Sequence, residues 1–360
     1  MKEMKNDGAT VTLPLRIDLA GGWSDTPPIC NAMGGCVLNA AISLEGVLPI
    51  KAEVRRIAGR EVRVESVDLG RRGVLRSDAE IRDHHDPLDW MALVKSALHV
   101  VGYTLRRDGG LDIRISAAVP KGSGLGTSSI LGAALVTALR QVLGGERDWR
   151  AVSELVLRLE QEMRTGGGWQ DQMGALLPGV KLVSSKPGAA QVISVKRATR
   201  AAEAAFSAYL EENALLYFTG RKRLARNVLN GVVNFFKDNP DGLAGEIVQT
   251  LKADARDAFA AIGQGDWGRF CAVLNGYWLN KKALDPGSTN QMVESTIARI
   301  APWTAAVSLC GAGGGGFMFI VARGPAEKAK IRASLEKRPI SRAARFYDFS
   351  LLTAAGPAGR

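Results

Sequence analysis

The chain has 360 residues, of which 46% are hydrophobic, and this excludes both a disordered chain and a small disulfide scaffold. Residues 1–10 are polar and no run approaches about 18 apolar residues, so we expect a cytoplasmic protein without a membrane partner. The formal charge of +11 is spread along the chain without a nucleic-acid motif, so we predict no nucleic-acid partner. The four cysteines form no CxxC pair, which favours reduced thiols over a zinc site.

The first half of the chain shows strand patterns before helix patterns. Alternating apolar and polar residues predict a strand over residues 11–19, which ends in a Gly-Gly turn. Further strands are expected at 36–42, 47–57, 61–67 and 111–118, with a polar connection over 68–83. Helices are expected at 88–101, at 128–143 and from Asp148 onward, where Glu160 borders an apolar stripe. This order favours an α+β fold over a doubly wound sheet.

The second half alternates alanine-rich helices with short strands. The helices are predicted at 201–212, 223–236, 243–262 and 267–281, and the strands at 214–218 and 317–321. A loop at 184–190 suits a boundary between domains. We therefore predict an N-terminal domain over 1–185 and a C-terminal domain over 186–360.

A glycine-rich loop lies between the strand that ends near residue 118 and the apolar helix that follows. Backbone N–H groups and hydroxyls at a helix N-terminus favour phosphate. The loop lacks the Gly-Lys-Ser/Thr of a P-loop and the glycine spacing of a dinucleotide fingerprint. A flexible connection with an ordinary N-cap would explain one hydroxyl but not the repeated glycines. We predict that ATP phosphates bind at Pro120, Lys121, Gly122, Ser123, Gly124, Leu125, Gly126, Thr127, Ser128 and Ser129.

A second glycine cluster, residues 311–316, formally contains G-x-G-x-x-G. It runs directly into the apolar segment 317–320 instead of opening a helix, so the dinucleotide-binding context is absent. Two interpretations stay open: close approach of a ligand to the backbone, or a tight turn that packs against the first glycine loop.

Two further segments carry carboxylates in glycine-rich turns. Asp171 follows three glycines at 166–168 and could cap the next segment, or it could orient or deprotonate a substrate hydroxyl while Glu160 holds Mg²⁺. Between residues 15 and 28, Arg16 and Asp25 flank a Gly-Gly turn and an exposed-looking Trp23, which suits a polyhydroxylated ligand. The alternative is that Arg16 pairs with Asp18 or Asp25 and that Trp23 belongs to the core.

These elements, in this order, resemble the GHMP kinases over essentially the full chain. The loop at 120–129 is similar to the second motif of that superfamily and the segment 310–319 to the third. The resemblance implies the GHMP kinase fold, with an N-terminal domain like domain 2 of ribosomal protein S5, a ferredoxin-like C-terminal domain and the active site between them. It also implies ATP and Mg²⁺ as cofactors.

Within the superfamily the chain most resembles the L-fucose kinases. The resemblance lies in 21–30, Gly34-Gly35, Leu38-Asn39, Pro49-Ile50, 85–88 and 167–172. Heptose 7-phosphate kinases share the segment at Thr219-Gly220 with Arg223, the patch at 278–282 and the continuation Ser288-Thr289-Asn290. The resemblance implies phosphorylation of the anomeric hydroxyl of L-fucose, with heptose 7-phosphate kinase as the alternative.

Residue roles follow from the same resemblance. Asp171 matches the catalytic aspartate, Arg16 the cation beside the reacting hydroxyl, and Ser128 and Glu160 the ligands of Mg²⁺. The residues expected at the sugar are Gly22, Trp23, Asp25, Gly168, Trp169, Gly313 and Gly314. The expected partners are the sugar and ATP, and the chain is expected to be a monomer or homodimer. Two other classes stay open: a non-catalytic sugar and ATP sensor on this fold, and an RNA-binding protein that uses the S5-like domain.

Overall fold

The computed structural model describes residues 6–86, 88–120, 122–145, 148–221 and 225–353. Its internal contacts define two compact units, each assembled from separate stretches of the chain. Unit 1 consists of residues 1–15, 48–119 and 126–177, and unit 2 of residues 16–47, 120–125 and 178–360. The predicted division at 185/186 stays a prediction. No helix among the described residues is long and apolar enough to cross a membrane.

Unit 1 contains a five-stranded sheet in the order β1-β4-β7-β5-β6. Its strands are β1 (Gly8–Leu13), β4 (Ile50–Ile57), β5 (Val62–Ser66), β6 (Arg71–Leu75) and β7 (Gly110–Ala117). All neighbours in this sheet are antiparallel except β5 and β7, which run parallel. The predicted strand at 11–19 is two strands, β1 and β2 (Leu15–Ala20), because Pro14 interrupts the pairing and β2 pairs with β3 in another sheet.

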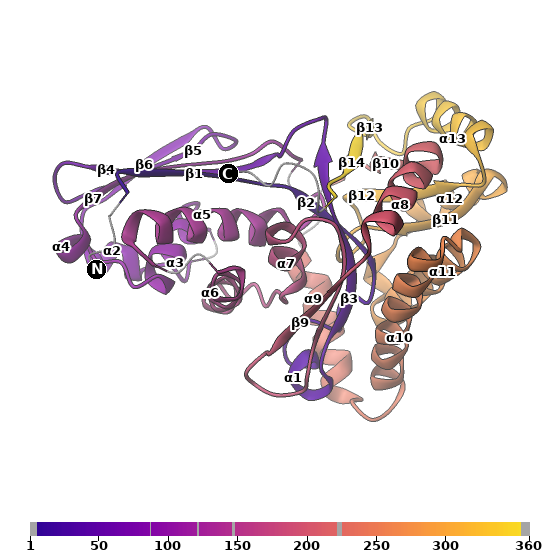
Figure 1. Cartoon of the computed structure of the whole chain (residues 1–360), viewed down its shortest axis with the longest axis horizontal. Coiled ribbons are helices and arrows are strands. Elements are labelled where there is room, and N and C mark those ends of the chain that lie inside the picture. Colours follow the sequence, from indigo (N-terminus) through magenta and orange to yellow (C-terminus); the bar gives the residue numbers. More distant parts are fainter. Residues whose placement is uncertain (1–5, 87, 121, 146–147, 222–224, 354–360) are drawn as a thin grey trace. The chain divides into compact units, whose positions relative to one another are not determined.

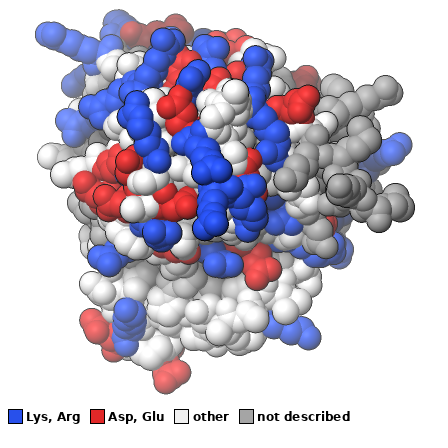
Figure 2. Space-filling view, turned by 90° about the vertical axis from the view of Figure 1, so that its left-hand side faces the viewer, with Lys and Arg blue, Asp and Glu red and all other residues white. Residues whose placement is uncertain are grey.

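The two faces of this sheet differ in chemistry. Val54, Ile113 and Val64 face each other across three strands and are buried, and helix α5 (Thr127–Leu143) packs along β1 and β4 (Figure 1). The opposite face carries charges of alternating sign in register, in the order Glu53, Arg114, Glu65, Arg72. Figure 2 views the protein from the left-hand side of Figure 1 and shows Lys and Arg interleaved with Asp and Glu there. This face is therefore a ladder of cross-strand ion pairs rather than a stripe of one sign.

Helices form a second layer in unit 1. They are α2 (Asp78–Arg82), α3 (Ala92–Val100), α4 (Leu105–Asp108), α5, α6 (Trp149–Glu162) and α7 (Gln170–Leu176). Both α3 and α6 pack on α5. The polar connection expected at 68–83 contains β6 and α2 instead. Ser77 caps α2 by accepting from the backbone N–H of Glu80. The carboxylate of Glu80 reaches back and accepts from the N–H of Arg76, one residue before the N-cap, in a variant of the capping box.

Unit 2 contains two sheets. The first has the order β14-β3-β8-β9, with β2 added on β3; these strands are β2, β3 (Cys36–Leu44), β8 (Val180–Ser185), β9 (Ile193–Arg197) and β14 (Phe349–Leu351). The second has the order β11-β12-β10-β13 and is antiparallel throughout; its strands are β10 (Ala214–Phe218), β11 (Thr304–Leu309), β12 (Phe317–Ala322) and β13 (Arg345–Tyr347).

The second sheet confirms the ferredoxin-like prediction. Strand β10 is followed by helices, then β11 and β12, then a helix and β13, and the sheet order places β10 between β12 and β13. A β-α-β-β-α-β chain with this order is the ferredoxin-like arrangement. The α+β class is confirmed as well, because helices and mostly antiparallel sheets segregate in both units.

The helices of unit 2 cover these sheets (Figure 1). They are α1 (Ile29–Met33), α8 (Arg200–Asn213), α9 (Ala225–Asp238), α10 (Leu243–Gln264), α11 (Trp267–Leu284), α12 (Gln291–Ile300), α13 (Pro325–Lys337) and the 3₁₀ turns Pro286–Ser288 and Ala301–Trp303. Trp278 of α11, Val293 of α12 and Ile331 of α13 join Tyr217 and Met318 of the sheet in one buried cluster. Helix α10 packs on β3.

Candidate active site

The backbone of the glycine-rich loop adopts positive φ values, which glycine reaches more easily than any other residue. Gly122, Gly124 and Gly126 have φ values of 69°, 77° and 76°, a region that side chains disfavour. Helix α5 begins at Thr127, one residue before the predicted start, and no side chain caps it. Seventeen aligned peptide units therefore direct the positive end of their dipole at this turn. Lys121, part of the predicted phosphate loop, lies outside the described residues.

Asp171 lies against the start of this helix. It is the second residue of α7, and a Cβ built on Gly126 would lie 2.8 Å from its Cγ. The acidic residue does not occupy the N-cap of α7, which is Trp169. Within unit 1, Asp171 thus lies against Gly126 of the sequence-predicted phosphate loop, and the absent side chain at Gly126 makes this contact possible.

Glu160 is a buried carboxylate on the neighbouring helix α6. It accepts a hydrogen bond from Ser129 Oγ at 2.7 Å and another from Thr165 Oγ1. Burial raises the pKa of Glu160, the two hydroxyls lower it, and the charge of Asp171 raises it further. Ser128, the predicted partner of Glu160 at Mg²⁺, is exposed at the start of α5. The structure thus brings Ser129 rather than Ser128 into hydrogen-bond contact with Glu160, and the shared metal role of Ser128 stays a prediction.

A second cluster of charges, in unit 2, centres on Asp18. Its carboxylate accepts from Tyr277 Oη and the N–H of Gly311, both at 2.8 Å, and lies 3.4 Å from Lys281 Nζ. Arg16 Nη1 lies 3.7 Å from the same carboxylate and donates to the carbonyl of Gly124 at 2.8 Å. The alternative in which Arg16 pairs with Asp18 is therefore what the structure contains.

This buried cluster holds part of the first glycine loop. Arg16 anchors the loop carbonyl of Gly124, and Asp18 anchors the start of the second glycine cluster at Gly311. Burial lowers the pKa of Lys281 and raises that of Tyr277, while Asp18 raises both. Sequence reasoning missed Tyr277 and Lys281 as partners of Asp18, because more than 250 residues separate them from it.

The two glycine clusters pack backbone to backbone. A Cβ on Gly311 would lie 2.6 Å from the carbonyl oxygen of Gly124, and one on Gly316 would lie 2.4 Å from that of Ser123. The N–H of Phe317 donates to the carbonyl of Ser123 at 2.8 Å. The interpretation of a tight turn packed against the first loop is thus confirmed. Gly313 and Gly314 are buried against Ser288, and their role at a sugar stays a prediction.

Trp23 and Trp169 are not exposed surfaces. Their exposed fractions are 8% and 1%, so the expectation of an exposed Trp23 was wrong. The turn before Trp23 closes on the neighbouring strand, since a Cβ on Gly21 would meet the carbonyl oxygen of Cys36 at 2.0 Å. Asp25 is also fully buried. The indole N–H of each Trp finds no acceptor among the described residues. The predicted contacts of Gly22, Asp25 and Gly168 with sugar stay predictions.

The described residues form an α+β fold in which two glycine-rich turns pack against each other. Residues 92–179 match the family described as "GHMP kinases N terminal domain", so this part of the chain carries a GHMP kinase N-terminal domain. Among solved structures, the galactokinase of Lactococcus lactis in complex with galactose superposes with a TM-score of 0.72 at 16% identity, covering 97% of this chain and 95% of that one. This likeness shows the fold.

Three curated relatives are similar over most of this chain. The bifunctional fucokinase/GDP-fucose pyrophosphorylase of Arabidopsis thaliana is 39% identical over 91% of the chain, and the L-fucokinase/L-fucose-1-P guanylyltransferase of Bacteroides fragilis is 34% identical over 94%. The chain spans only 31% and 37% of the length of these two proteins. The D-glycero-alpha-D-manno-heptose 7-phosphate kinase of Campylobacter jejuni is 27% identical over 90% of this chain and 92% of its own length.

Proposed function

We propose that the chain is an ATP-dependent sugar kinase that phosphorylates the anomeric hydroxyl of L-fucose and yields L-fucose 1-phosphate. The observation that carries this proposal is its similarity, over more than nine tenths of its length, to two proteins named for fucokinase activity. The phosphate loop at the start of α5, with Asp171 against it, supplies the chemistry that such a reaction needs.

The residues around the start of α5 fit an Mg²⁺–nucleotide complex. Glycine-lined backbone and the N-terminus of α5 offer donors to phosphate oxygens, and Ser128 is exposed there. Glu160 provides a carboxylate oriented by Ser129 and Thr165. Mg²⁺, when bound, neutralises charge between the β and γ phosphates. We assign its protein ligands to Ser128 and Glu160.

Asp171 and Arg16 carry the proposed roles at the sugar. Asp171 orients the anomeric hydroxyl and accepts its proton as the oxygen forms a bond to the γ-phosphorus and ADP leaves. Arg16 is held by Asp18 and by the carbonyl of Gly124, so its guanidinium is fixed in orientation and would stabilise charge that develops on the phosphoryl group.

The second candidate is a kinase of heptose 7-phosphate, which the relative from Campylobacter jejuni favours. Such a substrate carries a phosphate at its far end and needs free Lys or Arg there. Lys281 is fully buried beside Asp18, and Lys282 pairs with Glu294 at 3.2 Å. Both lysines are thus engaged with carboxylates, which supports the uncharged sugar. Arg223, the third basic candidate, lies outside the described residues.

The test compares kcat/KM for L-fucose, D-arabinose, D-mannose and heptose 7-phosphate with the purified chain. We expect the highest value for L-fucose and a product sensitive to mild acid, as anomeric phosphates are. A preference for heptose 7-phosphate would contradict L-fucose as the substrate but would leave the proposed kinase activity intact. Absence of ATP consumption with every sugar, together with binding of ATP, would favour the non-catalytic sensor instead.

A further inference from the structure

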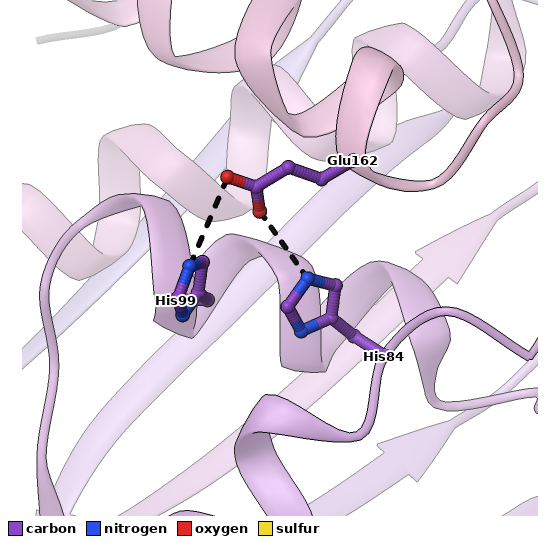
Figure 3. Close-up of side chains that lie close together, drawn as sticks. All are labelled: His84, His99 and Glu162. Atoms are coloured by element: carbon purple, nitrogen blue, oxygen red, sulfur yellow. Dashed lines mark ion pairs between the residues drawn. The ribbon is translucent and has the colours of Figure 1, made fainter.

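All three histidines of the sequence gather in one place in unit 1. His84 and His85 follow α2, and His99 lies in the last turn of α3. Glu162, the last residue of α6, lies among them, and Figure 3 shows its carboxylate facing the rings of His84 and His99. None of these side chains has a role in the proposed phosphoryl transfer.

The ligand atoms of this cluster lie close together. His84 Nε2 is 3.4 Å from Glu162 Oε2, and His99 Nε2 is 3.8 Å from Glu162 Oε1. One ligand atom from each of the three residues falls within 4.8 Å of the others. Ligand atoms at ~2.1 Å from a tetrahedral Zn²⁺ are separated by about 3.4 Å. The contact between His84 and Glu162 already has this spacing.

The hydrogen bonds of His84 leave the correct nitrogen available. Its Nδ1 faces the carbonyl oxygen of Ile81 at 3.4 Å, and this contact is a hydrogen bond when Nδ1 carries the proton, because a carbonyl can only accept. In the neutral ring with that tautomer, Nε2 holds a lone pair directed at Glu162, whereas a protonated ring would form an ion pair with Glu162. Metal-bound histidines are commonly oriented by this kind of bond from the other ring nitrogen to a backbone carbonyl.

When the His84 ring is neutral, the same atoms lack hydrogen-bond partners. The side chain of His84 is 97% buried, since only 3% of it is exposed. Among the described residues, His84 Nε2 and Glu162 Oε2 are both buried without a hydrogen bond. Buried polar atoms are rarely left so, because their desolvation is uncompensated. A lone pair on nitrogen and a carboxylate oxygen cannot hydrogen-bond to each other, but both can bind one cation.

We propose that His84, His99 and Glu162 form a binding site for one divalent transition metal ion, with Zn²⁺ the best match. Two imidazoles and a carboxylate are the ligand types that Zn²⁺ accepts, with water in the fourth position. Burial lowers the pKa of His84, which keeps the imidazole neutral and able to ligate. The side chain of His99 is 42% exposed, so its ring has room to turn toward the ion, and solvent can reach the open position.

Such an ion would join three separate segments of unit 1. It would connect the loop after α2, the end of α3 and the end of α6. We infer a structural ion that stabilises this corner, since anything that binds the folded state alone stabilises it. The site is independent of the proposed kinase activity and is testable without any substrate.

The experiment uses untagged full-length protein that has been dialysed against chelator and then titrated with Zn²⁺ in the absence of nucleotide. Calorimetry should give one ion per chain, and Co²⁺ should produce the visible absorption of a tetrahedral site. The thermal midpoint should rise with added Zn²⁺. Glu162→Gln and His99→Ala should each weaken Zn²⁺ binding by about 100-fold or more, because each removes a direct ligand.

Two variants serve as matched controls. Glu154→Gln makes the same change on the exposed face of α6, and His85→Ala removes the remaining histidine. Both should bind Zn²⁺ like the wild type. Circular dichroism of each metal-free variant checks the fold, with His99→Gln as a replacement if His99→Ala is unstable. Equal Zn²⁺ affinity in the wild type and both ligand variants, or no binding below millimolar Zn²⁺, would overturn the proposal. Loss of binding in His85→Ala would overturn the assigned ligands.

Discussion

The proposed catalytic role of Asp171 can be tested by a substitution that keeps the shape of its side chain. Its carboxyl group packs on Gly126 at the start of α5, so a substitution that keeps its shape leaves this packing intact. Asp171→Asn should fold and bind ATP like the wild type, with turnover reduced by about 100-fold or more because the acceptor of the proton is lost. Asp148→Asn, an exposed residue before α6, is the matched control. Turnover near that of the wild type in Asp171→Asn would contradict its catalytic role.

Glu160 can be either a metal ligand or a structural acceptor. If it holds Mg²⁺, Glu160→Gln should raise the Mg²⁺ concentration that gives half-maximal activity, while Glu154→Gln should not. The measurement is a Mg²⁺ titration at saturating sugar and fixed free ATP. If activity falls while the Mg²⁺ requirement is unchanged, Glu160 serves only as the partner of Ser129 and Thr165.

The buried Lys181 of β8 should make the stability of the folded protein depend on pH. Its ammonium group is fully buried and donates to the carbonyl of Gly179 at 3.0 Å. Burial and, to a smaller extent, the charge of Arg197 lower its pKa from the ordinary 10.5 to about 7, while the charge of Glu203 opposes them. Between these two pKa values the unfolded chain binds a proton that the folded chain does not. This group therefore makes the folded state less stable as pH falls from 10.5 to 7, with no further loss below 7.

Lys181→Met removes this titration and keeps the volume of the side chain. The free energy of unfolding of the variant minus that of the wild type should increase as pH decreases from 10 to 7, as measured by urea unfolding at several pH values. A difference that stays constant over this range would show that Lys181 is charged in the folded protein at every pH tested.

At the scale of elements, the contact between the two glycine clusters leaves no room for one added methyl group. Gly316→Ala places a Cβ within 2.4 Å of the carbonyl oxygen of Ser123 at a φ of 77°. Gly46 has a similar φ of 74° with nothing within 4 Å, so Gly46→Ala isolates the cost of φ alone. We expect Gly316→Ala to lose at least about 1 kcal/mol more unfolding free energy than Gly46→Ala. Equal losses would mean that the two clusters separate easily.

The sequence predicts helices and strands well where the hydrophobic pattern extends over many consecutive residues. Helices α5, α6, α8, α10 and α11 begin within two residues of expectation. Strands β13 and β14 have three residues each, too few to show a period of two. Helix α2 was recognisable from the S-x-x-E sequence at Ser77 and Glu80, which contact the start of the helix. The prediction of a polar connection over 68–83 did not use this signal.

In the candidate site as well, features encoded by neighbouring residues were predictable, and contacts between residues distant in the sequence were not. The glycine-rich turn before α5 was predicted from glycines within a short stretch of sequence, and the structure confirms the turn, while phosphate binding there and the role of Asp171 stay predictions. The partners of Asp18 do not, since Lys281 reaches it only through the fold. Burial of Trp23 and Trp169 was likewise not readable, because a tryptophan in a glycine-rich turn has the same sequence whether it faces solvent or core. Ser129, not Ser128, contacts Glu160, a difference of one residue that helix rotation decides.

At the scale of the whole molecule, the units interleave in sequence. The first sheet of unit 2 combines β2 and β3 from before residue 45, β8 and β9 from the middle, and β14 near residue 350. Helix α10, which packs on β3, also comes from the second half. A fragment of residues 186–360 would therefore expose the surfaces that β3 and β8 cover.

We accordingly expect neither 1–185 nor 186–360 to unfold cooperatively when produced alone, although each is a predicted domain. The measurement is thermal unfolding of the separate fragments and of both fragments mixed, with the intact chain as control. A sharp transition for 186–360 alone would show that the predicted boundary separates two units that fold independently.

The pairing of β14 with β3 has a consequence for synthesis. Ser43 lies beside Ser350, which is made 307 residues later, and Leu352 donates to the carbonyl of Ala41 at 2.9 Å. At the usual speed of a ribosome this interval lasts on the order of tens of seconds. During that time the end of β3 on which β14 later pairs, residues 42–44, is exposed and able to pair with another nascent chain. The demand for chaperones should therefore be greatest before residue 350 emerges, and synonymous codons that slow translation between β3 and β14 should lower the yield of folded protein more than the same codons placed after β14.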